Sequence, residues 1–216
     1  KALLGELATL RETQGEAELA FLAPFRAFKE DPNDAEVRRR LESATDASNT
    51  YDELVSAYEE SLPRVAEAAD AAEICLKLGQ MLETRLREPD RAITYYERAR
   101  SMHASVQEKS LVALDRLYLE LEAWSELGGV LAALAAGATV PADKVGFLFR
   151  LGQLCQQRLD SLGRAASAYE QILTLDPEHL ASARLLEGQY EAAGASDKLY
   201  AILQHELERV TGAERE

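Results

Sequence analysis

Histidine and cysteine are the residue types that would first suggest catalysis or metal binding in this chain of 216 residues. Three histidines are isolated from one another and from cysteine: His103, His179 and His205. The pair His205-Glu206 lacks the second histidine four residues on that a zinc-protease helix needs. Cys75 and Cys155 have no partner at metal-binding spacing. The sequence therefore predicts no metal site, no cofactor and no catalytic group.

Two other motifs with chemical potential have structural interpretations. Gly128-Gly129 follows Leu127 inside a predicted helix rather than a strand, so it lacks the setting of a phosphate-binding loop. We interpret the pair as a close helix contact or a local weak point. Acidic pairs such as Glu59-Glu60 are typical of a solvated helix face in an acidic chain. Both cysteines fall on the packed face of a predicted helix, which favours buried thiols over nucleophiles.

Charge and composition limit the partner classes. The chain has 38 acidic and 24 basic residues, a formal net charge of −14, and 47% hydrophobic residues. This balance predicts a folded core and disfavours a broad nucleic-acid surface or docking on anionic lipid. The apolar stretch from Leu131 to Ala136 is far below the roughly 20 residues that span a bilayer, so no membrane insertion is expected.

Cellular context is predicted only coarsely. Two cysteines favour a reducing, cytoplasmic compartment, with the periplasm as the alternative. The excess of arginine over lysine, together with the alanine content, suggests a bacterial source. The chain begins at Lys1 with no recognisable leader, so we expect either a removed signal or an excerpt of a longer protein.

An internal repeat organises the chain. Residues 78–99 match residues 151–172 at a constant offset of 73, and this long repeat contains two shorter ones. Each short unit has a leucine anchor in its first helix, then a turn and a second helix. The anchors are Leu7, Leu41, Leu78, Leu114, Leu151 and Leu186. The predicted units are approximately 1–34, 35–71, 72–107, 108–144, 145–179 and 180–216, forming a single array.

Certain residues recur at fixed offsets from each anchor. A small residue follows the anchor at Gly79 and Gly152, and a tyrosine occupies the second helix at Tyr96 and Tyr169. Proline closes units at Pro32 and Pro177, an alanine recurs 13 or 14 residues after the anchor, and Tyr118 and Tyr190 lie four residues after it. In these positions the chain resembles the tetratricopeptide repeat (TPR) family.

The resemblance implies an all-α fold: a right-handed superhelical α-solenoid of antiparallel helix pairs. Family members hold partner proteins in a concave groove lined by the first helices. Two units depart from the pattern, because Glu42 and Glu187 replace the small residue. In the first unit Arg11 takes a core position, and Pro24 falls inside the second helix, where proline removes a backbone donor.

Three offsets per first helix point away from the packed face and correspond to the family's groove positions. Of these 18 positions six are basic and one is acidic, although the whole chain is acidic. Leu76, Val112 and Phe149 would add apolar contact area. The predicted partner-binding groove comprises Arg39, Arg40, Lys77, Gln80, Arg116, Phe149, Arg150, Gln153 and Arg184. Such a basic trough would steer an acidic segment toward it; alternatively, its arginines pair with acids on neighbouring helices.

These patterns lead to one main hypothesis and one alternative. The first is a non-catalytic scaffold that binds a partner protein or acidic peptide in the groove. The alternative is a structural spacer or self-assembly module that stacks through its repeat ends. The family's two-carboxylate clamp for chaperone C-termini needs Asn beside Lys, and no groove position carries Asn. We therefore do not expect that particular activity.

Overall fold

The computed structural model describes residues 21–200 and 202–204, and the regular elements in these ranges are all helices. The chain divides into two compact units, residues 1–114 and 115–216. Helix α6 (Ala104–Glu120) contributes to both units.

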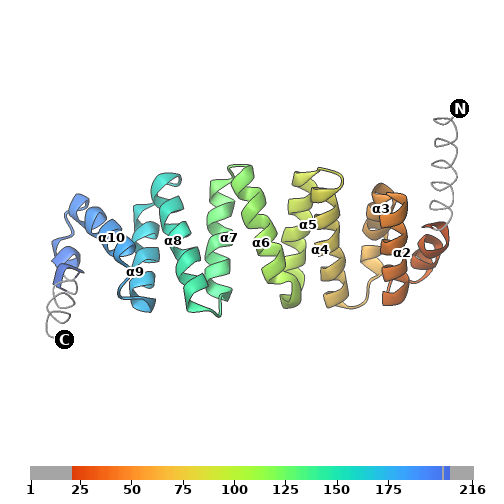
Figure 1. Cartoon of the computed structure of the whole chain (residues 1–216), viewed down its shortest axis with the longest axis horizontal. Coiled ribbons are helices and arrows are strands. Elements are labelled where there is room, and N and C mark those ends of the chain that lie inside the picture. The colour runs from red at the N-terminus through yellow and green to blue at the C-terminus, as the bar shows by residue number, and fades with distance from the viewer. Residues whose placement is uncertain (1–20, 201, 205–216) are drawn as a thin grey trace, which may run out of the picture. The chain divides into compact units, whose positions relative to one another are not determined.

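Helices of the first unit pack in chain order. Residues 21–30 are helical, and the elements after them are α2 (Ala35–Ser48), α3 (Tyr51–Ser61), the 3-10 turn η1 (Leu62–Arg64), α4 (Ala68–Thr84) and α5 (Pro89–Met102). Helix α2 contacts α3, α3 contacts α4, and α4 packs most extensively on α5 (Figure 1). The predicted helix–turn–helix units are therefore present here.

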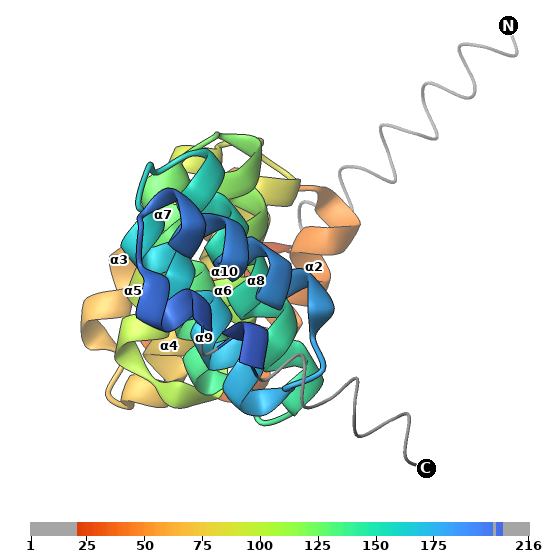
Figure 2. The ribbon, with the colours of Figure 1, turned by 90° about the vertical axis from the view of Figure 1, so that its left-hand side faces the viewer.

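The second unit repeats this arrangement. Its elements after α6 are α7 (Trp124–Gly137), α8 (Pro141–Gln157), α9 (Leu162–Leu175) and α10 (Leu180–Ala192), with residues 196–200 and 202–204 also helical. Helices α8 and α9 lie side by side in both views of the ribbon (Figures 1 and 2), and α9 also packs on α10. The predicted all-α class with paired helices is confirmed in each unit.

Local sequence signals explain where several helices begin. The Asp34 carboxylate caps α2 by accepting hydrogen bonds from the backbone N–H groups of Glu36 and Val37. Proline opens α5 at Pro89 and α8 at Pro141, where a missing N–H costs nothing. Pro24 lies within the helical residues 21–30 and does not end that helix, whereas Leu7, Arg11 and Gly15 are outside the described residues.

The repeat positions form the core. The five described anchors are all buried: Leu41, Leu78, Leu114, Leu151 and Leu186. The rings of Tyr96 and Tyr169 are buried against Gly79 and Gly152, where a Cβ atom would lie only 2.7 and 2.5 Å from ring carbons. A small residue after the anchor thus makes room for a tyrosine of the second helix.

The turn inside each described helix pair contains one residue with left-handed backbone. These residues are Asn49, Arg87, Glu122, Asp160 and Gly194, with φ between 46° and 64°. The sequence pattern predicts breaks at Asn49 and Gly194, and both are confirmed. The turns after α4 and α8 are closed by equivalent hydrogen bonds: the N–H of Glu88 bonds the Leu82 carbonyl and that of Ser161 bonds the Cys155 carbonyl, each at 2.8 Å.

Arg87 and Glu122 are poor residues for left-handed backbone, so replacing each by glycine should stabilise the unit that contains it. The strain of about 1–2 kcal/mol in an L-residue exceeds glycine's entropic cost, leaving a gain of about 0.5–1 kcal/mol. Urea unfolding of Arg87→Gly and Glu122→Gly measures this gain. The reverse change, Gly194→Ala, should destabilise, and an equal response of all three variants would contradict the explanation.

None of the described helices is long and apolar enough to cross a membrane.

Candidate functional site

The predicted groove residues of α2 lie on two sides of that helix. Both guanidinium groups bind the Glu36 carboxylate, Arg39 at 2.8 Å and Arg40 at 2.8 Å, and both side chains are at least 70% exposed. Arg39 lines a cavity of about 180 Å³ between α2 and α4, whereas Arg40 lines a separate one beside residues 21–30. The structure therefore does not bring this pair into one pocket.

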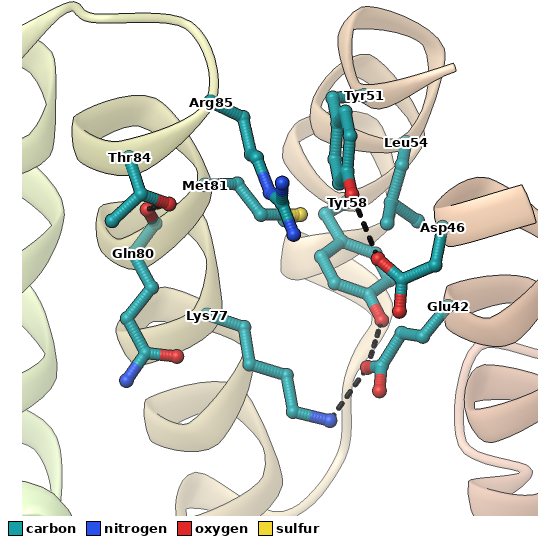
Figure 3. Close-up of a pocket in the computed structure, with 10 residues that line it drawn as sticks. All are labelled: Glu42, Asp46, Tyr51, Leu54, Tyr58, Lys77, Gln80, Met81, Thr84 and Arg85. Carbon is teal, nitrogen blue, oxygen red and sulfur yellow. Dashed lines mark hydrogen bonds and ion pairs between the residues drawn. The ribbon is translucent and has the colours of Figure 1, made fainter. Parts of the chain in front are cut away.

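Lys77 and Gln80 of α4 do share a pocket. It has a volume of about 250 Å³ and lies between α4 on one side and α2 with α3 on the other (Figure 3). The wall from α4 and its C-terminal end comprises Lys77, Gln80, Met81, Thr84 and Arg85; the opposite wall comprises Glu42, Asp46, Tyr51, Leu54 and Tyr58.

Two carboxylates organise the polar part of this pocket. Glu42 accepts hydrogen bonds from the Tyr58 hydroxyl and from Lys77 Nζ, each at 2.5 Å (Figure 3). Asp46 accepts from the Tyr51 hydroxyl at 2.8 Å, and the Arg85 guanidinium lies 4.9 Å from the centre of the Tyr51 ring. The pocket thus presents two cations, two aromatic rings and two anchored carboxylates.

Both tyrosines of the pocket stay protonated at neutral pH. Burial, reinforced by the Glu42 carboxylate, raises the pKa of Tyr58 strongly. Burial and the hydrogen bond to Asp46 raise the pKa of Tyr51. A phenol whose pKa is raised is a hydrogen-bond donor rather than a nucleophile or base. The arrangement is accordingly suited to polar recognition and supplies no activated group for catalysis.

Groove residues of the second unit are arranged around α8. Arg150 makes a bidentate ion pair with Asp115, with both N–O distances at 2.8 Å. The Phe149 ring packs 6.0 Å from Tyr169 and 5.4 Å from His179, measured between ring centres. Gln153 is half-buried, while Arg116 on α6 and Arg184 on α10 are exposed.

Ion pairs with acids are formed by Arg39, Arg40, Lys77 and Arg150 among the predicted basic positions. Lys77 and Arg150 are 73 residues apart, and so are their partners Glu42 and Asp115. These pairs join first helices of neighbouring repeats within each unit. The positive excess inferred from sequence is therefore partly neutralised.

Apolar groove positions behave differently from one another. Val112 is 54% exposed, as expected for a groove residue, but Leu76 is only 6% exposed. The expectation that Leu76 supplies groove contact area was wrong, because α4 is buried on a broad face that also includes Ile74 and Cys75.

Sequence reasoning missed the part of the pocket nearest the helix ends. Thr84 and Arg85 lie six and seven residues after the Leu78 anchor, beyond the three offsets taken from helical geometry. Asp46 lies five residues after Leu41 and was overlooked for the same reason. An arginine recurs at the 73-residue period, at positions 85 and 158, and this recurrence could have identified Arg85 from the sequence.

Histidine and cysteine have structural environments. His179 caps α10 by accepting from the Ser182 N–H, His103 is exposed, and His205 lies outside the described residues. Cys75 and Cys155 are fully buried, which confirms the prediction of buried thiols. Within residues 21–200 and 202–204, no group of three or more potential metal ligands comes together.

We expect both thiols to resist alkylation in the folded protein. Burial raises the pKa of Cys75 and that of Cys155, so neither offers an accessible thiolate. Iodoacetamide labelling followed by mass spectrometry should modify both residues in urea and leave them unmodified in native buffer over the same time. Rapid native labelling of either thiol would contradict this expectation.

Comparison with known proteins identifies no family model and no curated protein that matches the chain. Several solved structures are similar at low identity. The crystal structure of MamA shares 17% identity, covering 80% of this chain and 95% of that one, with a TM-score of 0.41. BtubC (BKLC) from P. vanneervenii shares 19% identity over 95% and 92%, with a TM-score of 0.43. The C-terminal part of a TPR repeat-containing protein from Cytophaga hutchinsonii shares 14% over 88% and 78%, at 0.44.

Proposed function

We propose that this chain is a non-catalytic, TPR-like scaffold that holds a segment of a partner protein along the first helices of its repeats. The observation that carries the proposal is the pocket between α2, α3 and α4, which includes the predicted groove residues Lys77 and Gln80. It is open, mixed in polarity and formed by side chains of neighbouring repeats. Such a surface suits a peptide segment better than a buried small molecule.

An acidic segment is the partner chemistry that fits best. Arg39 and Arg40 share a single carboxylate among the described residues, that of Glu36, so two guanidinium groups face one negative charge at this point of α2. Both side chains are largely exposed, and exposed ion pairs are worth only about 0–1 kcal/mol. A partner carboxylate can therefore join or replace Glu36 at little cost.

Photo-crosslinking tests the location of binding. A benzophenone amino acid at Gln80 or Gln153 should crosslink to a fluorescein-labelled peptide of alternating Glu and Ser. The matched controls place it at Ser101 on α5 and Gln171 on α9, which are exposed residues of second helices. Equal crosslinking at all four positions would contradict groove binding.

Charge reversal tests the chemistry of binding. Arg39→Glu combined with Arg184→Glu should weaken binding of the Glu–Ser peptide and reduce the dependence of its affinity on salt. The affinity of a Gln–Ser peptide of equal length should not change with the same substitutions. Unchanged affinity and salt dependence for the acidic peptide would overturn the proposal that its partner is acidic.

Self-assembly is the second candidate function, and one observation favours it. Tyr200, in the helical residues 196–200, and Leu203, in the helical residues 202–204, are 69% and 47% exposed. Both are large apolar side chains near the end of the described residues, and a second copy of the chain could cover them. Sedimentation of the wild type should show a concentration-dependent dimer that Tyr200→Glu abolishes; a monomer at all concentrations would rule this candidate out.

A further inference from the structure

An arginine stacked on an aromatic ring occurs once in each unit, at positions related by the 73-residue repeat. Arg85 lies over Tyr51 with its guanidinium carbon 4.9 Å from the ring centre, and Arg158 lies over Trp124 at 4.8 Å. Each arginine is the C-cap of a first helix, α4 or α8. Each ring belongs to the first residue of a second helix, α3 or α7, in the preceding repeat.

The neighbours of the two arginines are equivalent as well. Lys77 pairs with Glu42 at 2.5 Å in the first unit, and Arg150 pairs with Asp115 at 2.8 Å in the second. Glutamine recurs three residues after each of these cations, at positions 80 and 153. The same constellation of cation–acid pair, glutamine and ring-stacked arginine is thus built twice.

The stacked arginines differ from the paired cations in what they bind. Lys77 and Arg150 each have a carboxylate, whereas no described carboxylate forms an ion pair with Arg85 or Arg158. Both stacked side chains are exposed. A helix C-terminus favours a cation of either kind, which accounts for a charge at these positions. Only a planar guanidinium, however, can lie flat on a ring and still present N–H groups along its edge.

A carboxylate is the ligand that this edge fits. Two parallel N–H donors match the two oxygens of an Asp or Glu side chain, and the ring below restricts the orientation of the guanidinium before binding. We propose that Arg85 and Arg158, which occupy corresponding places in the 73-residue repeat, are two binding positions of different strength for acidic side chains of the partner segment. This inference rests on the scaffold function proposed above and names its specificity-determining residues.

One substitution makes the two positions unequal. Asp46, which accepts from the Tyr51 hydroxyl, is replaced in the second unit by Leu119, which is 48% exposed. Asp46 and Glu42 balance Lys77 and Arg85, so the first position is neutral. The second position, with Arg150, Arg158 and Asp115, has a net charge of +1. The Arg158 position should therefore bind an acidic side chain more tightly than the Arg85 position.

Arginine side-chain NMR on the full chain tests this inference directly. The probe is a 12-residue peptide of alternating Glu and Ser, and the control is its Gln–Ser counterpart. The Nε–Hε signal of Arg158, assigned through Arg158→Lys, should shift and saturate with the Glu peptide only. Arg158→Lys keeps the charge but loses the bidentate edge, so affinity should fall by about tenfold. Its unfolding midpoint shows whether the variant remains folded.

Exchanging the differing residue supplies a reciprocal test. Asp46→Leu should bring the Arg85 signal into the titration, and Leu119→Asp should weaken the response of Arg158. Arg98→Glu, on the exposed part of α5, is the charge control and should leave both arginine signals unchanged. Crosslinking at Gln80 and Gln153 without any shift of Arg85 or Arg158 would overturn this inference while leaving the scaffold function intact. Absence of any peptide binding would overturn both.

Discussion

Gly152→Ala is expected to destabilise the second unit by about 1–3 kcal/mol, because overpacking a rigid core forces neighbouring groups to move. The added Cβ would lie 2.5 Å from Tyr169 Cε1 and 2.7 Å from Cζ. The Tyr169 side chain is fully buried and cannot rotate into solvent. This clash opposes the gain of about 1 kcal/mol that alanine normally brings to a helix interior, so packing decides the sign.

Gly146 supplies a matched control in the same helix. A Cβ at Gly146 has no heavy atom of another residue within 4 Å, so Gly146→Ala should stabilise the unit by about 0.5–1 kcal/mol. Urea unfolding followed by Trp124 fluorescence and by circular dichroism measures both variants. Gly79→Ala should repeat the destabilisation in the first unit, where Tyr96 occupies the position of Tyr169. Stabilisation by both Gly152→Ala and Gly146→Ala would contradict this prediction, because it would show that the Tyr169 ring moves to make room for the added Cβ.

The pairing of glycine with tyrosine shows why much of this fold could be predicted. Core positions recur because each helix pair must bury the same face against its neighbours, and this leaves a periodic signal in sequence. The anchors, the two glycines and the buried tyrosines were all identified from that period. Turn geometry was predicted less well, since Arg87 and Glu122 adopt left-handed backbone without being typical residues for it.

The candidate site was less predictable than the core. Exposed positions are not constrained by packing. Helical offsets therefore indicate on which face of the helix a residue lies, but not which residues its side chain contacts. The offsets placed Lys77 and Arg150 on the groove face, but the acids that pair with them are on neighbouring repeats. Arg85 and Arg158 fall at helix ends, where the chain leaves the helical register and offsets lose their meaning.

Tyr58→Ala is expected to cause the largest loss of stability in the first unit, about 3–5 kcal/mol. The side chain is fully buried, and its ring centre lies 5.2 Å from that of Phe28 in the helical residues 21–30. Truncation would therefore remove a large aromatic contact and leave a cavity between two repeats. Thermal and urea unfolding of the variant measure this loss.

Tyr58→Phe separates the hydroxyl from the ring. Unlike Tyr96 and Tyr169, which face glycine, Tyr58 donates to Glu42, the residue that replaces glycine after the anchor. A hydrogen bond to a charged group contributes about 1.5–3 kcal/mol, so Tyr58→Phe should cost part of the effect of Tyr58→Ala. Tyr200→Phe, at an exposed tyrosine, is the matched control and should change nothing. A double-mutant cycle with Glu42→Gln isolates the interaction between the two side chains.

The pH dependence of these variants gives an independent check on the Tyr58–Glu42 contact. Because burial and the Glu42 carboxylate raise the pKa of Tyr58, its contribution to stability is complete below the unfolded pKa of about 10 and is lost as the pH rises above that value. Wild-type stability should therefore fall between pH 10 and 11 more steeply than that of Tyr58→Phe, which has no proton to lose at this position. Parallel curves for the two proteins would mean that the hydroxyl titrates normally, and the Glu42 contact would then contribute little to holding α3 against α2.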